Sequence, residues 1–249
     1  MELECIGVGE AFEPQLGNTS FLLHSETNLL IDCGYAVPRN LFSRNYPPDL
    51  IDALYVTHFH ADHFFGVPAM VYRWQEEGRK KPLTIIGQPG TKSLINRTID
   101  LGYPSCRSKL DFELKYLETT DPVALNELSL SFAQTDHSMK NYAIKITKGK
   151  SSIGISGDGG LTTKTRDLFQ DCTVLVHEAY TYDRAIQGHT YALDIVAFAK
   201  GLPTLQTLAL VHIQRDERAN RLSEFTALQK DVPFKLLAPE PGERIFLKT

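Results

Sequence analysis

Thr57-His58-Phe59-His60-Ala61-Asp62-His63 is the stretch of sequence that decides how this chain is interpreted. It places three imidazoles and one carboxylate within six residues, and imidazole nitrogen and carboxylate oxygen suit Zn²⁺, Mn²⁺ or Fe. Four such groups are too many for one catalytic ion that must keep an open position, so the spacing favours two adjacent ions. A polar turn with incidental histidines is the alternative. The clustering of three of the chain's eight histidines argues against it.

The other ligand-type residues follow apolar strands. The expected strand at residues 53–57 runs into the cluster. Four more expected strands and the residues that follow them are 128–133 before Thr135-Asp136-His137, 152–156 before Gly157-Asp158, 173–176 before His177-Glu178, and 208–211 before His212. Strand ends in layered α/β folds gather at one edge of the sheet, where ligands bind. We therefore expect these residues to converge on one site.

The remaining pattern is rich in strands early and mixes strands and helices later. Further strands are expected at residues 3–8, 20–24, 28–32, 83–86, 112–117, 142–146 and 244–247. Helices are expected at residues 35–44, 67–77, 90–101, 163–169, 191–200 and 217–229. No linker, low-complexity stretch or short repeat interrupts the chain. The prediction is one α/β domain, residues 1–249, with two sheets covered by helices.

Composition and charge narrow the class of protein. The 249 residues are 42% hydrophobic and 22% charged, as in an ordinary globular protein. The formal net charge of −4 gives no global basic footprint and disfavours unspecific nucleic-acid binding. Arg79-Lys80-Lys81 is the one basic run, and we interpret it as a solvated loop after a helix.

The expected location follows from three absences. No apolar run is long enough to span a bilayer, so no membrane partner is expected. Residues 1–7 resemble a first strand and not a signal peptide. The four cysteines are widely spaced and form no CxxC pair, which predicts buried free thiols in a reducing compartment. A cytoplasmic location is the expectation.

The sequence resembles the metallo-β-lactamase-fold superfamily, whose signature T-H-x-H-x-D-H matches Thr57 to His63. Further matches follow in order at Leu30-Ile31-Asp32-Cys33-Gly34, Gly66, Leu83-Thr84-Ile85-Ile86-Gly87 and Pro89-Gly90. Within the superfamily the chain is most similar to the branch of ribonuclease Z and related phosphodiesterases. That similarity rests on His177-Glu178-Ala179 and Gly188-His189-Thr190.

The resemblance implies a four-layer αββα sandwich with a dinuclear metal site at one edge. The implied ligands of the first ion are His58, His60 and His137. Those of the second are Asp62, His63 and His212, and Asp158 would bridge both. The ions would be Zn²⁺, with Mn²⁺ or Fe as alternatives.

The expected chemistry follows from two adjacent divalent charges, which generate hydroxide near neutral pH and stabilise charge on a substrate oxygen. Asp62 would also hydrogen-bond the hydroxide. His189 is the candidate general acid, held by Glu178, with Asp183 as the rival partner. Asp32 is expected to orient a metal-bound histidine, and His177 to lie behind the ligands or in the core.

The predicted function is hydrolysis of a small cyclic or nucleotide-like phosphodiester. Ribonuclease Z-type cleavage of tRNA is an alternative that the charge disfavours, because no basic, Gly-rich insertion is available for a polyanion. Lactone or thioester hydrolysis is another alternative. A non-catalytic metal-binding or ligand-sensing module is the alternative from a different class, and the complete ligand set argues against it. The base rate of symmetric assemblies and the resemblance favour a homodimer.

Overall fold

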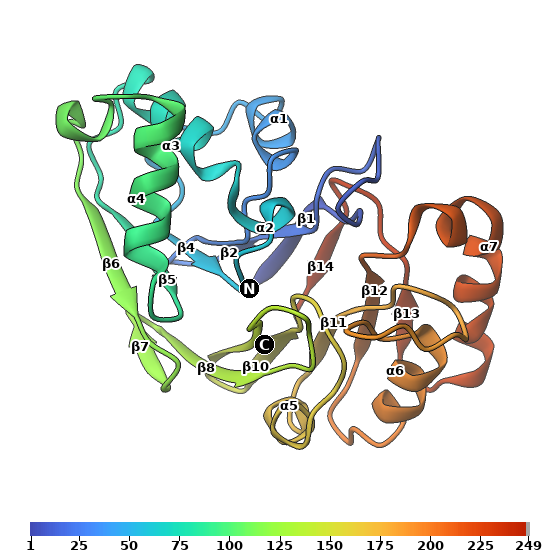
Figure 1. The fold of residues 1–249 in the computed structure, drawn as a ribbon. Helices are drawn as coiled ribbons and strands as arrows, with labels where there is room; N and C mark the ends of the chain where they lie inside the picture. Colours follow the sequence, from blue (N-terminus) through green and yellow to red (C-terminus); the bar gives the residue numbers. More distant parts are fainter. Residues whose placement is uncertain (248–249) are drawn as a thin grey trace.

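The architecture is two seven-stranded sheets packed face to face, seen in a computed structural model that describes residues 1–247 (Figure 1). The last two positions of the predicted domain, 248 and 249, lie outside the described residues. The first sheet has the order β14 (Arg244–Phe246), β1 (Glu2–Gly7), β2 (Ser20–His24), β3 (Leu29–Ile31), β4 (Ala53–Val56), β5 (Leu83–Gly87) and β6 (Leu114–Glu118). The second has the order β13 (Lys235–Leu237), β12 (Thr207–Val211), β11 (Val174–Glu178), β10 (Ser151–Ile155), β9 (Tyr142–Lys148), β8 (Leu128–Gln134) and β7 (Val123–Leu125).

Strand direction brings the important strand ends to one edge. In the first sheet, β3 to β6 are parallel. In the second, β10 to β13 are parallel, and β8 runs the same way as β10 because both are antiparallel to β9. The carboxyl ends of β8, β10, β11 and β12 therefore share one edge, as the strand-end argument requires.

Helices cover the outer face of each sheet, as Figure 1 shows. The first sheet carries α1 (Val37–Phe42), α3 (Val67–Glu76) and α4 (Thr91–Gly102), while α5 (Thr163–Phe169), α6 (Ala192–Ala199) and α7 (Arg215–Ala227) cover the second. One buried cluster, including Phe21, Tyr55 and Ile153, fills the space between the sheets. Two further clusters join each sheet to its helices. The predicted four-layer αββα sandwich is confirmed.

The elements missed in the sequence are short. They are α2 (Ala61–Phe64), η1 (Arg107–Lys109), η2 (Leu228–Asp231) and the strands β7 and β13. Both strands have three residues, and they lie at the two opposite edges of the second sheet. β13 is defined by its pairing with β12, and β7 by its hairpin with β8. Such pairing leaves little periodicity for a sequence pattern to detect.

Two expectations from composition can be compared with the structure. All four cysteines are buried free thiols, as predicted. Within residues 1–247, no helix is long and apolar enough to cross a bilayer.

The interpretation of Arg79 as part of a solvated loop is wrong, because its side chain is 0% exposed. The guanidinium lies over the rings of Trp74 and Phe112, 5.1 and 5.3 Å from their centroids. It donates hydrogen bonds to the carbonyl oxygens of Pro48, Ile51, Lys81 and Pro82. The basic run misled because a guanidinium has five donors and can satisfy carbonyls from two loops at once, here those before β4 and before β5.

We predict that Arg79→Leu destabilises the fold by about 3 kcal/mol, because the buried carbonyl oxygens lose their donors. Lys80→Ala is the matched control, since Lys80 makes an exposed ion pair with Asp111. It should change stability by less than about 0.5 kcal/mol. Urea unfolding of both variants measures the difference, and equal midpoints would contradict the structural role of Arg79.

Candidate metal centre

The histidine cluster is held at the sheet edge by close backbone packing. The loop after β4 leads into α2, which contains Asp62. The Asp62 carbonyl lies against Gly34 in the loop after β3. A Cβ atom on Gly34 would collide with that carbonyl, and one on Gly66 would collide with the carbonyl of Gly34. Both positions require glycine for this close approach. The sequence pattern Asp32-Cys33-Gly34 thus fixes where the cluster lies.

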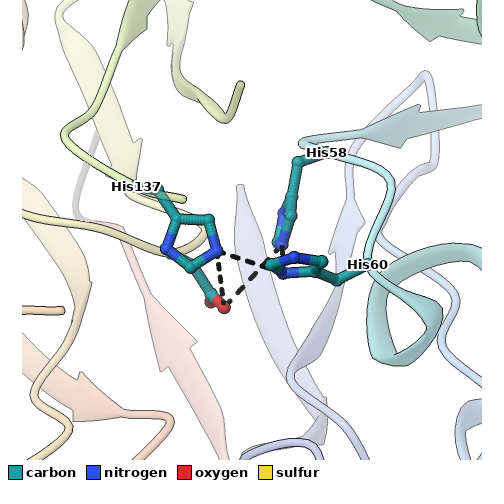
Figure 2. A group of neighbouring side chains, drawn as sticks. His58, His60 and His137 are labelled. Atoms are coloured by element: carbon teal, nitrogen blue, oxygen red, sulfur yellow. Dashed lines mark hydrogen bonds and ion pairs between the residues drawn. The ribbon is translucent and has the colours of Figure 1, made fainter. Parts of the chain in front are cut away.

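The first ligand group comprises His58, His60, His137 and Asp158, whose ligand atoms converge. Figure 2 shows the three imidazoles pointing toward one another. His60 Nδ1 lies 3.0 Å from His58 Nε2 and 3.1 Å from His137 Nε2. Asp158 Oδ2 lies 3.8 and 3.9 Å from the Nε2 atoms of His58 and His137.

The second ligand group comprises Asp62, His63, His212 and Asp158. His63 Nε2 lies 3.3 Å from Asp62 Oδ2 and 3.4 Å from Asp158 Oδ1. His212 Nε2 lies 3.5 and 3.4 Å from the Oδ2 atoms of the same two carboxylates. Asp158 is therefore common to both groups. All seven residues singled out as ligands in the sequence lie in these two groups.

The donor set fits two divalent ions. Three of its atoms, His63 Nε2, His212 Nε2 and Asp158 Oδ1, are buried without a hydrogen-bond partner, which is costly unless something else satisfies them. Two ligands bound about 2.0–2.1 Å from one zinc ion in a tetrahedron lie about 3.3 Å apart. The separations in the first group lie on both sides of that value, from 3.0 to 3.9 Å, and the nitrogen–oxygen separations in the second are 3.3 to 3.5 Å.

Neighbouring groups set which ring nitrogen is free. His63 Nδ1 donates to Asp32 Oδ2 at 2.7 Å, and His137 Nδ1 donates to the Gly188 carbonyl at 2.6 Å. His58 Nδ1 donates to the Thr57 hydroxyl at 3.0 Å, since that hydroxyl itself donates to Asp32. With Nδ1 engaged in this way, all three histidines turn Nε2 toward the site, the atom that each would offer to a metal ion.

The loop that carries Asp158 depends on Asn141, a residue the sequence did not single out. Asn141 is buried, and its side-chain oxygen accepts a hydrogen bond from the Asp158 amide at 3.2 Å. Its amide nitrogen donates to Thr135 Oγ1 and to the Ser156 carbonyl. A single asparagine near a strand start gives no sequence signal for this role, because its partners come from two other segments, at Thr135 and at Ser156 to Asp158.

Electrostatics divides the site into a neutral and a charged half. Burial and the neighbouring His63 hold the pKa of His58 well below its usual range, so its imidazole is neutral. Burial likewise opposes charge on His212, but the Asp158 carboxylate and a hydrogen bond to Asp62 outweigh it and raise its pKa to about 9. Burial disfavours charge on Asp158 also, but His212 and His63 lower its pKa well below the ordinary value. The Asp158 carboxylate is thus ionised, the form that binds metal.

Two site residues lie in strained backbone conformations. Asp32 has a φ of 58° and His212 a φ of 54°, in the left-handed region that residues other than glycine rarely adopt. Each conformation costs about 1 kcal/mol or more and persists because the surrounding structure enforces it. Strain at a carboxylate that holds His63, and at a candidate ligand, is consistent with a functional site.

Glu178 and His189 form a second arrangement beside the ligands. Glu178 Oε1 accepts hydrogen bonds from the amides of Gly159 and Thr190 at 2.9 and 2.8 Å. Its Oε2 lies 2.9 Å from His189 Nδ1 and 3.6 Å from His212 Nδ1. Burial opposes charge on His189, but the hydrogen bond to Glu178 raises its pKa.

The other two residues considered in the sequence lie outside this arrangement. Asp183 is not the partner of His189, because it is 49% exposed and pairs with Arg221 at 3.1 Å. His177 is fully buried, with its Nδ1 donating to the Glu178 carbonyl at 2.9 Å and its ring against Phe169. It belongs to no converging ligand group among the described residues.

Comparison with solved structures gives the class of fold to which this chain belongs. The structure is similar over 98% of its length, and 98% of the other chain, to the metallo-β-lactamase fold protein YhfI from Bacillus subtilis, with a TM-score of 0.81 and 20% identity. The chain has the metallo-β-lactamase fold.

Sequence comparison identifies the family. The family model described as anti-Pycsar protein Apyc1 matches residues 1–228. The anti-Pycsar protein Apyc1 of Bacillus phage vB_BsuM-Goe3 is 32% identical over 214 residues, which cover 76% of this chain and 82% of the relative. The chain belongs to the anti-Pycsar protein Apyc1 family.

The predicted similarity to ribonuclease Z is also confirmed. The ribonuclease Z of Pediococcus pentosaceus is 29% identical over 154 residues, or 59% of this chain. This match spans about half the length of that relative, 49%.

We predict that Asp32→Asn weakens metal binding about 10- to 100-fold, because the residue no longer holds His63 as a carboxylate does. Asparagine tolerates the left-handed backbone, so the fold should be retained. Asp183→Asn, at the exposed ion pair, is the matched control and should leave affinity unchanged. Competition with a chelator measures both, and equal affinities for the two variants would refute the orienting role of Asp32.

Proposed function

We propose that this chain is a dinuclear metal-dependent phosphodiesterase. The observation that carries the proposal is the contact of 2.9 Å between His189 Nδ1 and Glu178 Oε2 beside the shared carboxylate Asp158. Hydrolysis by a metal-bound nucleophile needs the ligand groups alone. A protonated imidazole beside them adds what a phosphodiester needs, which is a proton for the departing alkoxide.

Each residue has a distinct role in this proposal. His58, His60 and His137 would hold one ion, Asp62, His63 and His212 the other, and Asp158 both. When bound, such ions lower the pKa of a shared water and stabilise charge on the substrate. Asp62 orients the attacking water through its carboxylate. Glu178 keeps His189 protonated at Nδ1, and the other ring nitrogen gives its proton to the leaving oxygen.

We propose a small cyclic or nucleotide-like phosphodiester as the substrate. The net charge of −4 gives no excess of positive charge to follow a long RNA backbone, and Arg79, in the one basic run, is buried. The phage relatives are named anti-Pycsar proteins, and we infer the same role for this chain. Cleavage of tRNA, suggested by the ribonuclease Z relatives, is the second candidate.

Two alternative functions make different demands on the residues of this site. Lactone or thioester hydrolysis would use the ligand groups but would not require the pair Glu178 and His189. A non-catalytic module would tolerate loss of a ligand, whereas every proposed ligand and His189 are present. We propose further that residues 1–249 act as one domain and that two copies form a homodimer.

The direct test of this function is hydrolysis of bis(p-nitrophenyl) phosphate after chelation and return of Zn²⁺ or Mn²⁺. The wild-type protein should regain turnover with metal. Asp158→Ala should lose at least about 100-fold, since it removes the carboxylate common to both groups and even supporting residues are worth 10- to 100-fold. Asp183→Ala is the control. Two bound ions without turnover of any phosphodiester would overturn the proposal in favour of a binding module.

The role of His189 is tested by changing the leaving group. His189→Ala should slow cleavage of a diester with an alkoxide leaving group by about 10²- to 10⁴-fold. Cleavage that releases p-nitrophenolate should change little, because that anion leaves without a proton. Rates for a cyclic nucleotide, precursor tRNA, a lactone and a thioester identify the substrate class. Equal losses on both kinds of leaving group would remove the general-acid assignment and leave the metal centre intact.

A further inference from the structure

The candidate general acid is held by one hydrogen bond along only one edge of its ring. Glu178 fixes His189 Nδ1, but the imidazole ring could still tilt about that hydrogen bond, and this tilt would move Nε2. The side chain is 21% exposed, so the surrounding core does not fix it completely. Proton donation requires a ring whose free nitrogen stays aimed at one point. A second contact must define the plane of the ring.

Tyr180 supplies that contact. Its ring stacks on the His189 imidazole with centroids 4.4 Å apart and an interplanar angle of 19°. Two other rings lie farther from the imidazole: His137 in an edge contact, with centroids 5.2 Å apart and an angle of 71°, and His212 nearly parallel to it, with centroids 6.0 Å apart and an angle of 17°. Tyr180 is thus the nearest of the three rings and the one in stacking contact with the plane of His189, while Glu178 fixes the direction of the imidazole in that plane.

The backbone fixes Tyr180 relative to both histidines that it approaches. Its amide donates to the Thr190 carbonyl at 2.8 Å, which ties it to the residue after His189. Its carbonyl accepts a hydrogen bond from the Gln214 amide at 2.9 Å, which ties it to the segment after His212. Tyr180 is thus placed by the same strand ends that build the site, and its ring needs no adjustment to reach His189.

We infer that Tyr180 is a positioning residue that holds the His189 imidazole in the plane from which it donates a proton to the leaving group. The inference rests on the proposed function. The contact uses the face of the phenyl ring and not the hydroxyl, so phenylalanine should replace tyrosine. The proton itself passes from His189 to the leaving oxygen, and Tyr180 exchanges none.

The first experiment measures kcat of the metal-loaded protein on two substrates, a 3′,5′-cyclic nucleotide and bis(p-nitrophenyl) phosphate. Tyr180→Ala should lower kcat on the cyclic nucleotide by about 10- to 100-fold, since small misplacement of a catalytic group costs about that much. Its rate on the p-nitrophenyl ester should stay within about threefold. Tyr180→Phe should match the wild type on both. Tyr182→Ala, which removes a ring packed on Phe225, controls for loosening of the same loop.

A double-mutant cycle tests whether Tyr180 acts through His189. If it does, Tyr180→Ala should cause little further loss in a His189→Ala background. Equal losses on both substrates, an additive double variant, or a Phe variant as slow as the Ala variant would each overturn the inference.

An NMR readout separates this inference from the proposed function. The Nδ1–H signal of His189, hydrogen-bonded to Glu178, should persist in Tyr180→Phe and exchange faster with solvent in Tyr180→Ala. If the wild type cleaves neither substrate, the proposed function fails while this spectrum still decides the positioning. Identical exchange in the two variants would refute the role of Tyr180.

Discussion

The shared carboxylate of Asp158 is the interaction on which the rest of the site depends. It is 2% exposed and lies within 4 Å of ring nitrogens from His58, His63, His137 and His212. A buried carboxylate is tolerated only with compensating positive charge or hydrogen bonds. Three of the imidazoles follow β4, β8 and β12 and the fourth lies in α2, so the two sheets must meet at this edge for the charge to be balanced. The geometry of the candidate ligands therefore depends on the packing of the two sheets in the four-layer fold.

The residues that hydrogen-bond to the candidate ligands orient them for the proposed chemistry. Asp32, the Gly188 carbonyl and the Thr57 hydroxyl each fix one imidazole with its Nε2 inward. Glu178 lies between the candidate ligand His212 and His189, which is the group most specific to phosphodiester cleavage in the proposed mechanism. The ligand set is common to many hydrolytic reactions. In the proposed mechanism the reaction is selected by the groups beside this set, in the segment from Glu178 to Thr190.

Much of this organisation could be predicted from the sequence because it is local. The strands before His58 and His212 are mostly apolar, the strand before Asp158 is made of small and apolar residues that are all buried, and the polar residues come shortly after each strand ends. The fold class and the membership of the two ligand groups needed only this pattern and the resemblance it carries. The short strands β7 and β13 could not be predicted, because their pairing depends on neighbours and not on their own periodicity.

The sequence by itself determined the chemical type of each group at the site and the order in which the strands deliver them. Only the tertiary structure decided between Glu178 and Asp183 as the partner of His189, because the carboxylate nearer in sequence turns outward to Arg221. It also decided that Arg79 is buried and that Tyr180 lies on His189. These outcomes depend on contacts between segments brought together by folding. A hydrogen bond or a ring stack is set by distance in space, and spacing along the chain does not encode that distance.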